Sequence, residues 1–213
     1  MYVPSHFDEN RIDVLHDLIR GHSLAALITL GQDGFIANHI PLIVDPEPAP
    51  FGTLRGHLAK ANPQWKESRP DVPALAIFQG ASAYITPSWY PSKMETGKVV
   101  PTYNYAVVHA HGPLRIFDDP GVLERHLRKL TAAHESVFPR QWSVDDAPAS
   151  YISGLLKGIV GIEIPIARLE GKWKCSQNRS LADQAGVVDG LASSPDAVHQ
   201  EMARLISQNF MDK

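Results

Sequence analysis

The turn after residues 53–59 carries residue types that could hold a phosphate group. The segment Arg55-Gly56-His57-Leu58-Ala59-Lys60-Ala61-Asn62-Pro63-Gln64-Trp65 leads from an extended stretch into a helix start, with proline at the first helical position. A helix N-terminus offers free backbone N–H groups and a partial positive charge, to which Lys60 adds a formal charge. The pattern indicates an anion site or, as the alternative, an ordinary turn with a solvated lysine.

Two more polar groups follow strand-like segments. Phe78-Gln79-Gly80 ends an apolar run with an amide that can donate and accept hydrogen bonds, as the pyrimidine edge of a flavin requires. The segment Lys174-Cys175-Ser176-Gln177-Asn178-Arg179 combines cations, amides and a hydroxyl, which could bind phosphate or sugar hydroxyls. Each segment taken alone could equally be a solvated turn.

Aromatic and histidine residues also gather along the extended segments. Tyr84, Trp89 and Tyr90 present planar surfaces with polar tips, which suit a ligand pocket, an oligomer interface or the core. His109 and His111 stand two apart in an extended stretch, so both could point the same way. No third ligand with recognisable spacing accompanies them, which favours structural histidines and predicts no metal site.

Short elements must position these groups. Apolar spacing predicts helices at 8–20, 120–136, 150–157 and 194–210, the last with Ser194 as its N-cap. Strands are predicted at 23–30, 35–44, 53–59, 72–79, 82–90 and 159–173, with Gly80 separating two of them, and a long β-rich stretch at 99–117 is interrupted near Gly112-Pro113. Strands surrounded by short helices predict one α+β domain, a barrel.

Composition limits the classes of protein. The 213 residues carry 20 Lys and Arg against 23 Asp and Glu, a net charge of −3 with a pI of about 6.3. This balance disfavours a strongly basic nucleic-acid binder. The single cysteine, Cys175, forms no intrachain disulfide and no Cys-based zinc site. Because no signal peptide or spanning apolar segment is recognised, we expect a cytoplasmic protein without a membrane partner.

In their order along the chain, these segments resemble the PaiB family. The resemblance begins with residues 1–7 and continues to Ser176-Gln177-Asn178, which is nearly the whole chain. Between them lie Asn38-His39-Ile40-Pro41, Gly56-His57-Leu58-Ala59, Asn62-Pro63-Gln64-Trp65, Phe78-Gln79-Gly80, Ala83-Tyr84-Ile85-Thr86-Pro87-Ser88-Trp89-Tyr90, Val100-Pro101-Thr102-Tyr103-Asn104-Tyr105, Val108-His109 and Lys157-Gly158-Ile159-Val160-Gly161.

PaiB-like proteins are described as FMN-binding negative transcriptional regulators, associated with repression of sporulation and degradative-enzyme genes. The family is similar to the pyridoxamine-phosphate oxidases. The resemblance implies an α+β fold: a six-stranded split β-barrel with peripheral helices, forming a homodimer with FMN between the subunits. Residues 1–213 would form one domain, with 180–213 as a helical C-terminal extension.

The resemblance also implies cofactor-binding residues, with no catalytic residue assigned. The strand beside the flavin would contribute Asn38, His39 and Ile40, and the phosphate-side turn would contribute Lys60, Ala61 and Asn62. The ring edge would be faced by Gln79, and the partner subunit would bring Trp89, Tyr103 and Asn104 close to the ring. The segment that closes the site would consist of Ser176, Gln177, Asn178 and Arg179.

Two positions depart from the family pattern. Tyr103 stands where many relatives have tryptophan, and Cys175 stands where an aliphatic residue is common. Tyr103 could therefore stack on a ligand or bind it through its hydroxyl. The thiol of Cys175 is not expected to have a role in function.

The resemblance favours a regulator that is not an enzyme. The alternatives are an FMN-dependent oxidoreductase acting on a small substrate or a nicotinamide, and a haem-handling split barrel in which His109 or His199 ligates iron. The family name leaves DNA as a partner, but the sequence has no clear helix-turn-helix and no basic footprint.

Overall fold

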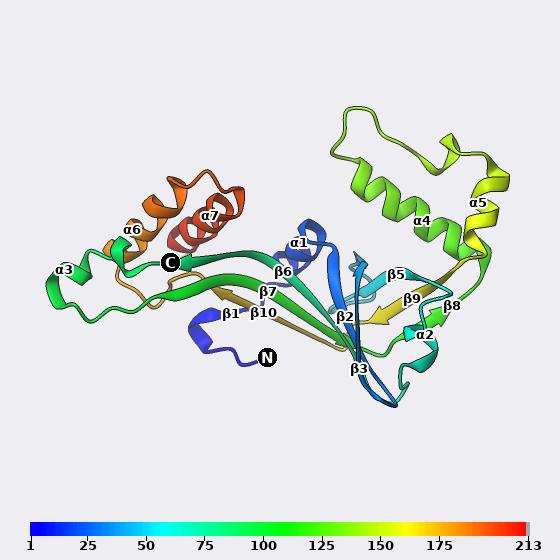
Figure 1. Cartoon of the computed structure of the whole chain (residues 1–213), viewed down its shortest axis with the longest axis horizontal. Helices are drawn as coiled ribbons and strands as arrows, with labels where there is room; N and C mark the ends of the chain where they lie inside the picture. Colours follow the sequence, from blue (N-terminus) through cyan, green and yellow to red (C-terminus); the bar gives the residue numbers. More distant parts are fainter. Residues whose placement is uncertain (212–213) are drawn as a thin grey trace. The chain divides into compact units, whose positions relative to one another are not determined.

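The computed structural model describes residues 1–211, which fall into two units by their internal contacts (Figure 1). The barrel unit comprises residues 22–78 and 110–169. The terminal unit comprises residues 1–21, 79–109 and the chain from residue 170 onward. Hydrogen bonding orders the strands into a sheet of six, β1-β10-β7-β6-β2-β3, and a sheet of four, β4-β5-β9-β8.

The strands of the barrel unit alternate buried and half-buried side chains. On β5, Leu54 and Leu58 are buried in the core, whereas Arg55 and His57 lie on the opposite face of the strand. The elements of this unit are β2 (Leu24–Gly31), β3 (Gly34–Pro41), β4 (Ile43–Asp45), β5 (Thr53–Ala59), α2 (Gln64–Glu67), β8 (Arg115–Phe117), α4 (Pro120–Glu135), the 3-10 turn Val144–Asp146, α5 (Ala149–Leu156) and β9 (Ile159–Pro165).

The chain passes from one sheet to the other at short corners. The segment 35–44, predicted as one strand, is divided at Leu42, whose backbone N–H donates to the Ser23 carbonyl at 2.8 Å. Segment 159–173 divides in the same way at Ile166, which donates to the Gly52 carbonyl at 2.9 Å. The prediction of one strand in each place was wrong because periodicity records burial and does not show which sheet each half joins.

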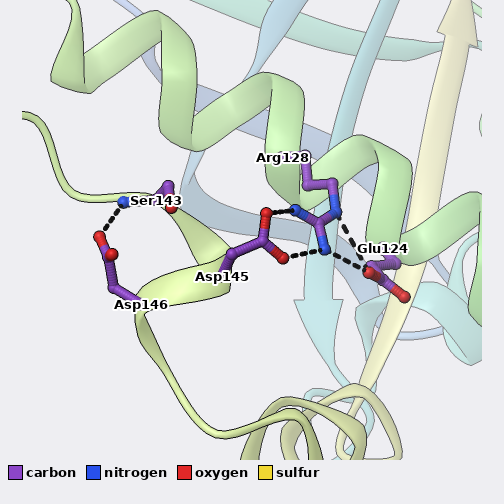
Figure 2. Close-up of polar contacts among 5 residues, drawn as sticks. All are labelled: Glu124, Arg128, Ser143, Asp145 and Asp146. Carbon is purple, nitrogen blue, oxygen red and sulfur yellow. Dashed lines mark hydrogen bonds and ion pairs between the residues drawn. The ribbon is translucent and has the colours of Figure 1, made fainter.

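Helix α4 follows the predicted range closely. Asp119 caps it by accepting a hydrogen bond from the Val122 N–H at 2.8 Å. Figure 2 shows how the loop after α4 is held: Arg128 makes a two-pronged ion pair with Asp145, both bonds at 2.7 Å, and also contacts Glu124 at 2.8 Å. These exposed charges anchor the segment leading to α5, which contacts α4 (Figure 1).

The terminal unit consists of long strands with helices from both ends of the chain. Two of these helices, α6 and α7, pack against each other (Figure 1). Its elements are the 3-10 turn Ser5–Phe7, β1 (Asp8–Glu9), α1 (Ile12–Gly21), much of β6 (Ala74–Ile85), the 3-10 turn Pro87–Trp89, α3 (Ser92–Thr96), most of β7 (Thr102–Gly112), most of β10 (Arg168–Lys174), α6 (Leu181–Ala192) and α7 (Ala197–Met211).

Two sequence predictions need correction here. Gly80 does not divide two strands: β6 runs through it, and an added Cβ would lie 3.1 Å from Leu18 of α1, so the glycine allows close packing. Ser194 does not cap the last helix. Asp196 holds that position, because its carboxylate accepts from the Val198 N–H at 2.9 Å.

None of the helices in the described part of the chain is both long enough and apolar enough to cross a membrane.

A buried histidine pair joins α4 to β5 within the barrel unit. His57 Nδ1 and His126 Nε2 lie 3.3 Å apart, and His126 is only 4% exposed. Burial lowers the pKa of both rings. The pKa of His126 falls to about 4, because positive charge at His57 and Arg55 adds to the effect of burial. Both rings are therefore neutral at pH 7.

We predict that this pair makes the fold acid-sensitive before the carboxylates titrate. The pKa of His126 is lower in the folded chain than its ordinary 6.5, so the unfolded chain takes up protons first. The contribution of the pair to stability is present above about pH 6.5 and is lost toward pH 4, with about 3 kcal/mol of the loss due to His126 alone. Urea unfolding from pH 7.5 to 5 checks this: His126→Gln should flatten the decline. The same flattening with the exposed His6→Gln would contradict it.

Candidate functional site

The phosphate-side turn predicted from sequence is held by one buried amide of the barrel unit. Gln64, at the start of α2, has no exposed surface. Its side-chain oxygen accepts from Asn38 at 2.9 Å, and its backbone N–H donates to Asn62 Oδ1 at 3.0 Å. The predicted residues Asn38 on β3 and Asn62 in the turn are thus tied to one residue, Asn38 to the side chain of Gln64 and Asn62 to its backbone.

The NH₂ group of Gln64 binds the two strands of a hairpin. It lies 3.2 Å from the Leu27 carbonyl and from Thr29 Oγ1 on β2, and 3.3 Å from the Ile36 carbonyl on β3. A buried amide with every group hydrogen-bonded holds one geometry, because each alternative leaves a polar atom unpaired. The turn after β5 is therefore fixed to the β2–β3 hairpin.

Lys60 leaves this turn with its charge accessible. Its Nζ lies 2.9 Å from Asp118, and the two side chains are 36% and 56% exposed. Lys157 lines the same pocket of about 380 Å³, together with Gly121 near the start of α4. An exposed ion pair contributes little stability, so Asp118 can be exchanged for an anionic ligand at small cost.

The other predicted residues of the barrel unit differ in accessibility. His39 is exposed on β3, while Ile40 is 4% exposed and packs in the core. Ala61 is exposed in the turn. The alternation of β3 explains the difference between His39 and Ile40, and it leaves only the backbone of Ile40 able to face a ligand.

The predicted residues of the terminal unit form a second group around the end of β10. Asn104 on β7 is buried and donates to Ser176 Oγ at 2.8 Å. Ser176 has a φ of 63°, the only positive φ of a non-glycine residue in the described chain. Gln177 closes this turn, since its oxygen accepts from the Cys175 N–H and its amide donates to the Trp173 carbonyl. The left-handed residue thus sits in a turn held from several sides.

An aromatic and cationic layer lies next to this turn. The Arg179 guanidinium stacks over the Tyr90 ring, 4.7 Å from its centroid. Burial raises the pKa of Tyr90, and its hydroxyl is buried without a hydrogen-bond partner in the described residues. Trp89 packs against α6, where a Cβ on Gly186 or Gly190 would collide with it.

Gln79, Tyr103 and Asn178 are exposed members of the predicted set. Gln79 lies on β6 and Tyr103 on β7, where the Tyr103 ring meets Tyr84 edge-to-face at 5.7 Å. The six predicted residues in the barrel unit and the eight in the terminal unit thus form two groups.

Three residues that organise these groups were not predicted. Gln64 holds the phosphate-side turn, Asp118 neutralises Lys60, and Asp183 anchors α3 by accepting from the Ser92 N–H and hydroxyl. Asp118 precedes a recognisable helix start, and Ser180 with Asp183 has the spacing of a helix cap. No local signal distinguishes Gln64 from an exposed glutamine.

Comparison with known proteins assigns the class. The family model described as "Putative FMN-binding domain" matches residues 1–168. An uncharacterized protein of Emericella nidulans is 36% identical over 225 residues, covering 89% of this chain and 90% of that protein. The Bacillus subtilis protein named protease synthase and sporulation protein PAI 2 is 29% identical over 210 residues, covering 99% and 98%.

The fold also agrees with solved structures. The flavocytochrome Anf3 of Azotobacter vinelandii superposes with a TM-score of 0.58 at 10% identity, covering 81% of this chain and 72% of that one. The fold is the α+β split β-barrel that the resemblance implied. The chain belongs to the family of FMN-binding domains and is a PaiB-like member of it, with FMN as its cofactor.

The residues of the barrel unit fit the phosphate end of FMN. A phosphate dianion needs cationic donors that are free to turn toward it. Lys60 offers an ammonium group whose present carboxylate is exposed, and Lys157 offers a second in the same pocket. The turn that presents Lys60 is prearranged by Gln64, so little entropy is lost when a ligand binds.

We predict that Gln64→Met lowers the free energy of unfolding by roughly 2–4 kcal/mol, because the buried groups bonded to Gln64 lose their partner. Gln32→Met, in the exposed turn between β2 and β3, is the control and should change stability little. Urea unfolding measures both. Equal effects of the two substitutions would show that the buried amide does not hold the turn.

Proposed function

We propose that this protein binds FMN with its phosphate at the Lys60 turn and its ring beside β3, in a homodimer that acts as a PaiB-type negative regulator. The observation that carries the proposal is the turn itself, in which an accessible ammonium group stands next to Asn62, whose side chain accepts from the backbone N–H of the buried Gln64. Asn38 and the backbone of Ile40 would border the ring. Bound FMN would supply a ring that accepts and returns electrons.

Ring-side contacts are proposed to come from a second copy of the chain. Gln79, exposed on β6, has the donors and the acceptor that the pyrimidine edge of the ring requires. Tyr103 and Tyr84 lie on the neighbouring strands β7 and β6 and are 60% and 48% exposed. Exposed tyrosines in contact with each other favour an interface, where tyrosine is enriched.

We propose that regulation does not need direct contact with DNA. The Bacillus relative's name ties that protein to protease synthesis and sporulation. Against direct binding stand the net charge of −3 and the pI of about 6.3, which provide no electrostatic attraction for a nucleic acid. Flavin occupancy would then bias the dimer toward a form that binds another component, shifting a population.

We predict that Lys60→Ala and Gln79→Ala each weaken FMN binding by roughly 1–3 kcal/mol, the cost of an unpaired buried partner in the complex. Quenching of flavin fluorescence during titration gives the affinity. Lys66→Ala, which removes an exposed cation one turn away, and Gln32→Ala are the matched controls. Unchanged affinity in both test variants would refute this placement of the cofactor.

A second prediction concerns assembly and DNA. The FMN-loaded protein should be a dimer by light scattering, and the pair Tyr84→Ser with Tyr103→Ser should shift it toward the monomer. A monomeric wild type would disprove the shared site.

In gel-shift titrations, the dimer should give no salt-dependent DNA binding. A DNA complex that weakens with salt would disprove indirect regulation.

A further inference from the structure

A second pocket in the barrel unit lies on the face of β5 opposite the core. It has a volume of about 510 Å³ and is bounded by β4, β5, the end of β8 and helix α4. Its residues do not include any that border the Lys60 pocket. It is large enough for a small organic molecule.

The pocket carries an excess of positive charge. Arg55, Arg125 and Lys129 line it, and Asp45 is the one carboxylate among its lining residues. Asp45 is already bound by Arg55 at 2.7 Å. The pKa of Asp45 is lowered most by a hydrogen bond from the backbone N–H of Glu47, and the contact with Arg55 lowers it further. The Asp45 carboxylate is therefore largely neutralised.

Two of the cations form no ion pair in the described residues, although the charge of Lys129 contributes to the lowered pKa of Asp45. Arg55 also approaches Glu163 at 3.6 Å, but within residues 1–211 neither Arg125 nor Lys129 forms an ion pair. They stand four apart on α4, on one side of the helix, where like charges repel each other. An anion in the pocket would relieve this repulsion and gain charge-assisted hydrogen bonds.

A buried polar atom at the pocket also lacks a partner. His126 lines the pocket and is 4% exposed, and its Nδ1 makes no hydrogen bond in the described residues. Its other nitrogen is occupied by His57. When His57 donates the hydrogen bond to His126 Nε2, the proton of the neutral His126 ring is on Nδ1. A ligand oxygen that accepts from this buried N–H would then be favoured over an empty site.

The remaining walls are apolar. Ile43, Val44, Phe117 and Val122 line the pocket. The Phe117 ring packs directly over Gly161, where an added Cβ would come within 2.1 Å of it, so the glycine lets the ring lie flat against β9. Apolar walls next to cations suit a ligand with an apolar body and an anionic end.

We propose that this pocket binds a small organic anion, an aromatic or aliphatic body ending in a carboxylate or a phosphate, at a site separate from that of FMN. The anionic group contacts Arg125 and Lys129, and its oxygen also meets His126. The apolar body lies against Phe117 and Val122. This gives the protein a second ligand, which acts on the helix that borders both pockets.

The test uses the purified full chain, with and without excess FMN, and calorimetric titration with benzoate, phenyl phosphate and the neutral benzyl alcohol. One or both anions should bind with a stoichiometry of one, and benzyl alcohol should bind at least tenfold more weakly. The variant Arg125→Gln/Lys129→Gln should weaken anion binding about tenfold or more. Arg140→Gln removes an exposed cation outside the pocket and should leave binding unchanged.

Proton uptake on anion binding distinguishes direct contact between His126 and the anion from a purely structural role of His126. Below pH 6.5 the bound anion should raise the pKa of His126, so the complex takes up a proton and the heat depends on the buffer. His57, Arg55, Asp45, Arg125 and Lys129 are the other charged or titratable groups around this ring. His126→Gln should remove most of the uptake while FMN binding persists.

Three results would overturn the proposal. The first is that neither anion binds at millimolar concentration, and the second is that Arg140→Gln weakens binding as much as the double variant. The third is that the anions release bound FMN as they bind, which would assign the pocket to the flavin phosphate. The Lys60→Ala variant tests the FMN site alone. A failure of the proposed FMN site can therefore be distinguished from a failure of the proposed anion pocket.

Discussion

The complete burial of one amide side chain is the constraint on which the candidate cofactor site depends. Gln64 contacts both strands of the β2–β3 hairpin, Asn38 and the turn that carries Lys60. Because an unpaired buried amide is costly, the hairpin and the turn are fixed together. The accessible ammonium of Lys60 therefore stands on a rigid support, which is what recognition of a phosphate requires.

The same strand serves two purposes because its side chains alternate. Leu54 and Leu58 of β5 fill the core, while Arg55 and His57 face helix α4. Neutral histidines allow α4 to pack on a face that already holds cations, since two protonated rings could not share the contact. The cost is acid sensitivity, and the result is a pocket in which Arg125 and Lys129 form no ion pair within the described residues.

Sequence predicted the local elements well where burial and periodicity coincide. Residues 53–59 form β5 as predicted, and α4 ends one residue before the predicted helix does. Prediction failed where a residue's neighbours are distant in sequence: Gly80 permits contact with Leu18, and Leu42 turns the chain into another sheet. Helix α6 had no prediction of its own, because Gly186 and Gly190 weaken its pattern and are explained only by Trp89 packed against them.

The site residues likewise fall into those that local sequence indicates and those that depend on contacts distant in sequence. The place of Lys60 in a turn before a helix could be predicted because a helix start and a cation lie together in sequence, and its role toward a phosphate stays a prediction. Gln64 and the pocket beside His126 depend on contacts over 26 and 69 positions. The resemblance to the PaiB family identified FMN, which the residues alone left open. It could not identify the second pocket, whose charges come from two strands and a helix that are far apart along the chain.

Phosphate recognition by the Lys60 turn is the central claim, and comparing FMN with riboflavin tests it most directly. The two ligands share the ring and the ribityl chain and differ only in the phosphate. Fluorescence titration of the full chain should show FMN binding at least tenfold more tightly than riboflavin, with the preference lost in Lys60→Ala and kept in Arg125→Gln/Lys129→Gln. Equal affinity of the wild type for the two flavins would contradict the account.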